Sequence, residues 1–198
     1  MKKTIYACIA TCLVIISTSC NKETEVASPG LQSSSIDASQ PSDKHFIGEH
    51  FGGGIIFYLN NSGDHGLIAA SADFEEAIFW SEKDTLNGAT DTALGSGAGN
   101  TRRIVKIQGF PEFEADTYAA LECLELSQNG YQDWYMPSIG ELNKLYENKA
   151  IIGGFQQFSY WSSSESNTKK AWLKNFNNGS QVLQVKTASY AVRPVRKF

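Results

Sequence analysis

The chain has 198 residues, a length that fits one folded domain together with targeting and linker segments. It carries 17 Lys and Arg against 21 Asp and Glu, a formal net charge of −4, and this mildly acidic balance gives no reason to expect a nucleic-acid partner. Three of its four cysteines lie in the first 20 residues, so the rest of the chain cannot form an intramolecular disulfide of its own.

The beginning of the chain is typical of a bacterial lipoprotein signal peptide. Two lysines precede the apolar run 5–16, which is too short to span a bilayer as a helix. Small residues then lead to Cys20, as in a lipobox, although Ser17 stands where Leu is usual. We expect residues 1–19 to be removed and Cys20 to carry acyl chains, palmitate among them, that anchor the protein without spanning the membrane. An ordinarily cleaved secreted protein is the alternative.

Residues 20–44 have the composition of a flexible tether. They are rich in Ser, Asp, Gln, Pro and Ala, and they offer too little apolar surface to offset the entropy of ordering. The segment Asn21-Lys22-Glu23-Thr24-Glu25 resembles the signal that moves lipoproteins of some Gram-negative lineages to the outer face of the outer membrane. We therefore expect a lipid-anchored outer-membrane protein that faces the cell exterior and carries one domain at residues 45–198.

The first part of this domain predicts a β-hairpin followed by irregular structure. Residues 54–60 are rich in β-branched and aromatic side chains, residues 61–66 have turn chemistry, and residues 67–71 form the second strand. Between residues 73 and 99 short apolar groups alternate with loop residues, which indicates a long irregular loop region.

Helices are predicted in the middle of the domain. Asn100 or Thr101 is expected to cap a short helix that reaches Gln108, and a longer helix is expected over residues 114–128, ending at Asn129-Gly130. Further on, Ser138-Ile139-Gly140-Glu141 has the spacing of a capping box that opens another helix.

The last third of the chain predicts strands. Four segments fit, at residues 158–162, 172–176, 181–186 and 190–196, and Asn178-Gly179 is a strong signal for a type I′ turn between the middle two. Strands at both ends with helices between them indicate an α+β domain with one antiparallel sheet, in which the first and last strands pair.

Five short motifs along the domain together resemble one family. In chain order they are Gly52-Gly53-Gly54-Ile55-Ile56-Phe57-Tyr58, Gly66-Leu67-Ile68-Ala69-Ala70, Asp133-Trp134-Tyr135-Met136-Pro137-Ser138, Tyr160-Trp161-Ser162-Ser163-Ser164-Glu165 and Val192-Arg193-Pro194-Val195-Arg196. From about Gly48 to Phe198 the chain resembles the family named after the C-terminal domain of the Legionella collagen-like adhesin. The resemblance implies a C-type-lectin-like fold with paired terminal strands, two main helices and a long irregular loop region, displayed on a bacterial surface. Its best-known member binds sulfated polysaccharides.

The resemblance also marks a set of signature residues, for which structural roles are the first expectation. The tryptophans are expected in the core, with each indole N–H bonded to a backbone carbonyl, rather than stacked on a sugar. The arginines are expected to pair with Asp133 or Glu141 and so hold loops in place. The set is Asp133, Trp134, Pro137, Trp161, Arg193 and Arg196. Relatives of this type form oligomers, often trimers, but no collagen-like repeat is present here to enforce trimerisation.

No metal or cofactor is expected. The glycine-rich segment 95–99 lacks the spacing of either nucleotide-binding glycine motif. His45, His50 and His65 are scattered without the spacing of metal ligands. The triplets through which many sugar-binding C-type lectins hold calcium, Glu-Pro-Asn or Gln-Pro-Asp and then Trp-Asn-Asp, are also absent.

The sequence favours a protein that is not an enzyme. Cys123 has helical spacing with apolar neighbours, which predicts a small buried residue instead of a nucleophile. The implied fold is similar to that of formylglycine-generating enzymes, but these need a pair of active-site cysteines. Asp133, Glu141 and Glu165 are available for glycoside hydrolysis, yet no spacing places two of them across a cleft. An uncharacterised hydrolase is kept as a third hypothesis.

The leading hypothesis is therefore a non-catalytic domain that binds an extracellular ligand, a glycan, in adhesion. A structural or assembly subunit of an envelope or fimbria-like structure, making protein contacts, is the alternative. For an anionic polysaccharide, the predicted binding residues are Arg102, Arg103 and Lys106, placed at the start of a helix where backbone amides and the helix dipole attract anions. A solvated basic face is the simpler interpretation of these cations.

Overall fold

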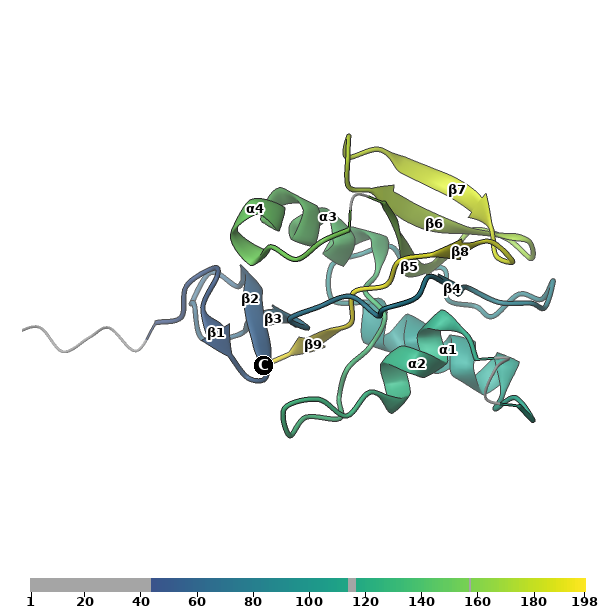
Figure 1. Cartoon of the computed structure of the whole chain (residues 1–198), viewed down its shortest axis with the longest axis horizontal. Helices are drawn as coiled ribbons and strands as arrows, with labels where there is room; N and C mark the ends of the chain where they lie inside the picture. The colour runs from purple at the N-terminus through teal and green to yellow at the C-terminus, as the bar shows by residue number, and fades with distance from the viewer. Residues whose placement is uncertain (1–43, 114–116, 157) are drawn as a thin grey trace, which may run out of the picture. The chain divides into compact units, whose positions relative to one another are not determined.

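Antiparallel strands and four helices make up the part of the chain that the computed structural model describes, residues 44–113, 117–156 and 158–198 (Figure 1). These residues belong to one compact α+β unit. The predicted signal peptide, Cys20 and the tether up to residue 43 lie outside the described residues. No helix within the described ranges is long and apolar enough to cross a membrane.

One four-stranded antiparallel sheet contains both the first and the last strands of the domain. It consists of β1 (His50–Phe51), β2 (Gly54–Leu59), β3 (Gly66–Ala69) and β9 (Val195–Lys197), in the order β1-β2-β3-β9. The predicted hairpin is confirmed as β2 and β3. The last strand pairs with β3, with Ile68 opposite Arg196, and not with the first predicted strand. The reason is that β1 occupies the other edge of β2.

The prediction of a single sheet is wrong, because the described residues form three. A second sheet pairs β4 (Ile78–Phe79) with β8 (Ser189–Tyr190), and a third has the order β5-β6-β7. The third sheet consists of β5 (Ser159–Glu165), β6 (Lys170–Asn175) and β7 (Gln181–Val185). The segment between β8 and β9 touches β5 at one isolated bridge, Tyr160 to Ala191. Pro194 in this segment has no N–H to donate, so it cannot extend a ladder between the sheets.

The type I′ turn lies at a different Asn-Gly pair from the one predicted. Asn129 and Gly130 have φ of 52° and 83°, and Gln128 and Tyr131 exchange two backbone hydrogen bonds of 3.0 Å around them. Positive φ at both central residues is the mark of a type I′ hairpin turn. At the predicted position only Gly179 has a positive φ, and its N–H donates to the carbonyl of Asn175 at 2.8 Å, so β6 and β7 are joined by a longer loop.

The first two helices differ from their predicted bounds. The first, α1 (Gly97–Gln108), begins before the predicted cap at Asn100 or Thr101. Both side chains are buried within the helix and bond to neighbouring carbonyl oxygens, Asn100 to Asp91 at 2.6 Å and Thr101 to Gly97 at 2.8 Å. The second, α2 (Ala119–Glu125), is shorter than the predicted range, because Leu126 is already extended with ψ of 120°.

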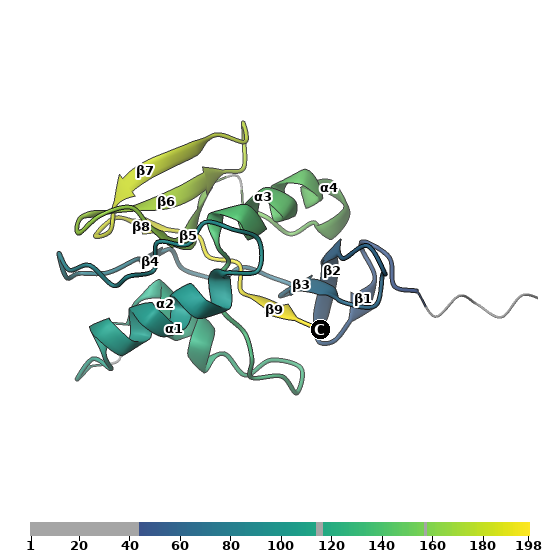
Figure 2. The ribbon, with the colours of Figure 1, turned by 180° about the vertical axis from the view of Figure 1, so that it is seen from behind.

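The third helix begins with the predicted capping box. In α3 (Ile139–Glu147) the Ser138 side chain accepts from the Glu141 N–H, and the Glu141 carboxylate accepts from the Ser138 N–H at 2.7 Å. A short helix, α4 (Lys149–Ile152), follows directly. Contacts place α3 between β2 and the β5-β6-β7 sheet, while α1 packs against α2 and β5 (Figures 1 and 2). The large buried side chains therefore lie between the sheets and helices, while residues 82–86 after β4 and residues 110, 112 and 113 after α1 are exposed.

Candidate functional site

The signature tryptophans lie in the core and not at the surface. Trp134 and Trp161 are fully buried, as is Trp80, which the family motifs do not include. The indole N–H of Trp161 donates to the Ala188 carbonyl at 3.2 Å, and that of Trp80 to the Ser162 carbonyl at 2.8 Å. The indole N–H of Trp134, in contrast, has no hydrogen-bond partner among the described residues. None of these three rings is available to stack on a sugar.

The two signature arginines hold loops through separate carboxylates. Arg196 makes a bidentate pair with Asp133, with bonds of 2.7 and 2.9 Å, and its guanidinium lies over the Tyr131 ring. Arg193 is fully buried and pairs with Asp73, a residue that the motifs do not include. It also donates to the carbonyl oxygens of Ala70 and Gly154 at 3.0 and 2.8 Å. Pro137 lies just before the capping box of α3.

The three predicted ligand-binding cations do not lie at a helix N-terminus. Arg102 and Arg103 are in the middle of α1 and Lys106 is in its last turn, and all three are exposed. The first residue of α1, Gly97, is buried close to the Glu141 carboxylate, so the start of the helix is not open to an anion there. Any attraction of these cations for an anionic polysaccharide therefore depends on their own charges, and their role stays a prediction.

A buried polar network fixes the loop that follows β4. The Glu165 carboxylate, at the end of β5, accepts from Lys186 at 2.6 Å and from the backbone N–H groups of Asn87 and Gly88 at 2.9 and 3.0 Å. The Lys186 ammonium also donates to the Thr85 carbonyl at 3.0 Å. A carboxylate that accepts this many hydrogen bonds holds the surrounding backbone in one conformation. Although burial opposes ionisation, the bonds from Lys186 and Asn87 keep the pKa of Glu165 below its ordinary value.

The network continues from Asn87 to the end of α1. Gln108 donates its side-chain N–H to the Asn87 side-chain oxygen at 2.9 Å. The backbone carbonyl of Gln108 in turn accepts from the Lys83 ammonium at 2.7 Å. Residues that follow β4 are thereby held against the C-terminal end of α1, beside a hollow in the surface.

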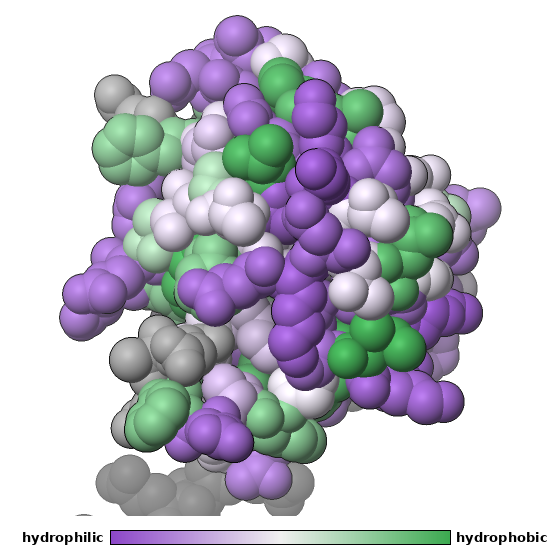
Figure 3. Space-filling model, turned by 90° about the vertical axis from the view of Figure 1, so that its right-hand side faces the viewer, coloured by the Kyte–Doolittle hydropathy of each residue, from purple (hydrophilic) through white to green (hydrophobic). Residues whose placement is uncertain are grey.

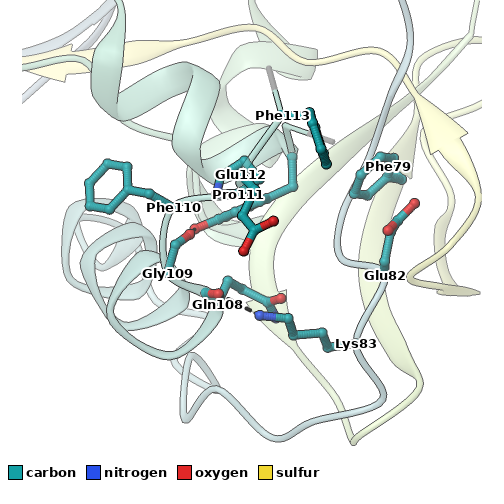
Figure 4. A pocket seen from close by; sticks show the side chains of 10 residues that line it. Phe79, Glu82, Lys83, Gln108, Gly109, Phe110, Pro111, Glu112 and Phe113 are labelled. Atoms are coloured by element: carbon teal, nitrogen blue, oxygen red, sulfur yellow. Dashed lines mark hydrogen bonds between the residues drawn. The ribbon is translucent and has the colours of Figure 1, made fainter. Parts of the chain in front are cut away.

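The hollow is a pocket of about 300 Å³, which we call the aromatic pocket (Figure 4). The end of β4 and the loop after it form one wall, and the end of α1 with the segment after it forms the other. In the view of Figure 4 the rings of Phe79 and Phe113 lie near each other, while the ring of Phe110 lies apart from them and points outward. The lining residues are Phe79, Glu82, Lys83, Gln108, Gly109, Phe110, Pro111, Glu112, Phe113 and Tyr118.

The aromatic pocket combines exposed rings with charged groups. Phe110 and Phe113 are 72% and 68% exposed, although large aromatic side chains are usually buried. Glu82 and Glu112 bring carboxylates to the rim. At the base, the Tyr118 hydroxyl donates to the Gly109 carbonyl at 2.8 Å, and burial, together with the nearby Glu125 carboxylate, raises the pKa of Tyr118 to about 12. The tyrosine is therefore a neutral hydrogen-bonding group at physiological pH.

Sequence reasoning did not identify the aromatic pocket. Gly109-Phe110-Pro111 directly follows the predicted helix end at Gln108, and Gly and Pro there are sufficiently explained by helix termination. The available signal was the pair of phenylalanines on either side of Pro111 in a segment that is too short to bury them. A larger hollow of about 440 Å³ lies beside Phe158 and Tyr190, but no charged side chain lines it.

Other predicted chemical features can be located directly. Cys123 is a buried free thiol, and burial, with a smaller contribution from Glu122, raises its pKa well above the ordinary value. This confirms the prediction of a small buried residue. Asp133 and Glu165 are bound to cations, and Glu141 is in the capping box, so all three carboxylates have structural partners. Across the described ranges, no group of three or more His, Cys, Asp or Glu side chains could hold a metal ion.

The family model of the Lcl C-terminal domain matches residues 69–196, which include the aromatic pocket and the last three motifs. The chain belongs to the Lcl C-terminal domain family. This membership fits a surface or envelope protein. Among curated proteins, none matches the chain significantly.

The chain is also similar to a solved structure, that of a fimbrial protein from Bacteroides ovatus ATCC 8483. The two share 17% sequence identity with a TM-score of 0.49. The match covers 72% of this chain and 43% of the fimbrial protein, so the chain spans less than half of that protein's length.

Proposed function

We propose that this domain is the non-catalytic, ligand-binding part of an outer-membrane lipoprotein that acts in adhesion at the cell surface. Its ligand is a glycan, and the aromatic pocket is the site. The fold is C-type-lectin-like, with the long irregular region after β4 forming one wall of the site. Support comes from membership in the Lcl C-terminal domain family and from the lipoprotein-type signal at Cys20.

The aromatic pocket is the single observation that carries this proposal. Rings hold the apolar faces of sugars, while carboxylates and carbonyl oxygens accept from sugar hydroxyl groups, and such combinations of apolar walls with a few polar groups are typical of ligand sites. Glu82 and Glu112 outnumber Lys83, whose ammonium is already bound to Gln108. The charge of the pocket therefore favours a neutral or amino sugar over a sulfated one.

The face of the domain at the right of Figure 1 has a surface that suits a polar ligand. Figure 3 shows the face at the right of Figure 1, where hydrophobic side chains are separated by hydrophilic ones and form no broad patch. Specific protein interfaces usually have an apolar centre. A mixed surface of this kind fits a sugar chain better than a flat hydrophobic partner.

A glycan array tests the proposal with the purified protein and matched variants. Phe110→Ala and Phe113→Ala should each weaken binding to the selected glycan at least tenfold, because each removes a stacking surface. Phe46→Ala is the control, since Phe46 is 64% exposed and lies outside the aromatic pocket. Binding that survives both pocket substitutions would place the glycan elsewhere or refute the proposal.

The predicted anionic version is tested separately on heparin. If Arg102, Arg103 and Lys106 bind sulfated polysaccharide, their triple Ala variant should lose retention on a heparin column while keeping its melting temperature. The retention should also fall steeply with salt, because exposed charges are screened over about 8 Å at physiological ionic strength. A double variant of Lys169→Ala and Lys170→Ala, exposed at the start of β6, is the control for loss of positive charge elsewhere on the surface. Passage of the unaltered protein through heparin at low salt would exclude this version.

The alternative, an assembly subunit, is favoured by one observation. Among the described residues β7 pairs with β6 alone, so its other edge is free, and Val182 and Val185 on it are exposed. A free edge can add a strand from another chain. Under this alternative, a Val182→Lys and Val185→Lys variant should lose its partner in a cross-linked envelope extract, whereas Phe110→Ala should retain it.

A further inference from the structure

A lysine, a glutamate and an asparagine from distant parts of the chain meet in the interior of the domain. Lys186, Glu165 and Asn87 are only 1%, 2% and 4% exposed. The Glu165 Oε1 atom accepts from Lys186 Nζ at 2.6 Å and from Asn87 Nδ2 at 2.9 Å. The Thr85 carbonyl oxygen also accepts from both of these nitrogens, each at 3.0 Å. Because the two nitrogens share two acceptors, the lysine amine and the asparagine amide lie side by side.

The trio is flanked by an aromatic ring and by a hydrogen-bond donor. The ring of Trp80, which is fully buried, lies 4.6 Å from Lys186 Nζ. Burial opposes the charged form of Glu165, but the bonds from Lys186 and Asn87 outweigh it and keep the pKa of this carboxyl group low, so the protonated carboxyl group is a minor species from which the reaction proceeds. The Asn87 oxygen accepts from Gln108 Nε2 at 2.9 Å, and a donor at that position stabilises negative charge that develops on the oxygen.

We propose that Lys186 and Asn87 join in an intramolecular isopeptide bond, with Glu165 as the catalytic residue. This modification is independent of the glycan-binding proposal. An ion pair needs only the carboxylate and the ammonium. The bond explains why the Asn87 amide is buried beside them as well.

The reaction balances without any further reagent. Glu165 takes a proton from the Lys186 ammonium, and the neutral Nζ attacks Cγ of Asn87 to form the new carbon–nitrogen bond. Negative charge on the Asn87 oxygen is held by Gln108 during this step. Glu165 then passes a proton to Nδ2 and receives one from Nζ, and the Cγ–Nδ2 bond breaks. Ammonia leaves, the amide between Cγ and Nζ remains, and the surplus proton stays on Glu165 or departs as ammonium.

Cys123 is a free thiol and gives the described part of the domain no disulfide. The isopeptide bond would supply a covalent cross-link instead. It would close the chain between the loop after β4 and the end of β7. Such a link restricts the unfolded chain in the same way as a disulfide does. It would also fasten one wall of the aromatic pocket, since Asn87 bonds to Gln108 in the lining.

Peptide mapping by mass spectrometry tests the proposal on the purified full-length chain. The expected result is a joined pair of peptides, one containing Asn87 and one containing Lys186, lighter than their sum by one ammonia molecule. Lys186→Arg keeps the cation but removes the amine nucleophile, and Glu165→Gln removes the proton carrier, so neither variant should yield the joined pair. A lower melting temperature of Lys186→Arg than of the unaltered chain would accompany the loss.

Three results would overturn the proposal. The first is recovery of both peptides unlinked from the unaltered chain. The second is loss of ammonia within the Asn87-Gly88 peptide alone, which is the signature of a succinimide formed by the Gly88 backbone nitrogen and would persist in Lys186→Arg. The third is loss of water in a link between Lys186 and Glu165. The unaltered chain decides among these results even if the variants do not fold.

Discussion

The surroundings of Asp133 and Glu141 shift the pKa values of these two carboxyl groups in opposite directions. The bond from the Arg196 guanidinium lowers the pKa of Asp133, against a weaker opposing effect of burial. Burial raises the pKa of Glu141, and the bonds from Ser138 and the Tyr135 hydroxyl offset only part of this effect. Asp133 therefore stabilises the fold in its charged form, while the fold favours the neutral form of Glu141 more than the unfolded chain does.

The Asp133 pair predicts a specific pH dependence. Its folded pKa lies below the unfolded value of about 3.9, so its contribution is complete above that pH and is lost as the pH falls through the folded pKa. The Asp133 side chain is 56% exposed, and solvent screening limits the contribution to about 0.5–1 kcal/mol. Asp133→Asn should therefore lower the free energy of unfolding by that amount at pH 7, as measured by urea denaturation.

The difference between Asp133→Asn and the unaltered protein should shrink as the pH falls below about 3.9. Asp64→Asn, an exposed carboxylate in the hairpin turn, is the control and should have little effect on stability at either pH. A constant difference across this pH range would show that the Asp133 substitution acts through packing and not through charge.

Residue pairs close in sequence were more predictable than distant ones. The Ser138 and Glu141 capping box follows from a fixed spacing, because the geometry of one helical turn brings the two side chains together. The pairing of Arg196 with Asp133 was one of several open choices. The partners Asp73 and Lys186 were missed, because only the complete fold brings them to Arg193 and Glu165.

Two glycines in the first turn of α1 have different reasons for their presence. A Cβ atom at Gly97 would meet the Glu141 carboxylate and lie 2.8 Å from the Met136 carbonyl oxygen and the Ser138 nitrogen. At Gly99 the nearest atom is the flexible end of Arg103, at 3.3 Å. The start of α1 thus depends on the close approach of another segment, and not on helix propensity.

Substitution of these two glycines should therefore have opposite effects. Gly97→Ala should destabilise the protein by roughly 1–3 kcal/mol, because overpacking forces the backbone or Glu141 to shift. Gly99→Ala should be neutral or stabilise by up to about 1 kcal/mol, because Ala favours a helix over Gly. Thermal unfolding of the two variants measures the difference. Equal effects would contradict the role assigned to Glu141 at the start of α1.

Among the elements, local signals identified the type of structure but not always its position. The hairpin and α3 were predicted because turn residues and a capping box mark their ends. The start of α1 was missed, since Asn100 and Thr101 look like caps but bond within the helix and its neighbours. The Asn-Gly signal was assigned to the wrong loop, because the chain has three Asn-Gly pairs and the structure around each pair decides the turn type.

At the scale of the whole molecule, anchoring is the first prediction to test. Cys20→Ala should abolish labelling with palmitate and move the protein out of the membrane fraction, because no acyl chain could then be attached. Cys123→Ala is the control, since this thiol is buried in the folded domain. Labelling that persists in Cys20→Ala would refute the lipoprotein assignment, and release of both variants would implicate folding instead.

The family could be predicted from the sequence, whereas the candidate site could not. Motifs such as Asp133-Trp134 and Arg193-Pro194 contain residues that pack in the core or form ion pairs that hold loops. Relatives of one fold share these features. The aromatic pocket depends on two loops whose residues follow no periodic pattern. Its walls are joined by the bonds among Gln108, Asn87 and Lys83, which residues distant in the sequence make only in the folded domain.

The contact between the two ends of the domain has a practical consequence for attaching the domain to a surface. The ring of His45 lies 5.1 Å from that of Phe198, so the domain begins and ends at the same place. In Figures 1 and 2, β1 and β9 lie at one end of the domain, while α1 extends towards the opposite end. A label or solid support attached through the C-terminus would therefore leave the aromatic pocket open to solvent, as the proposed lipid attachment on the N-terminal side would.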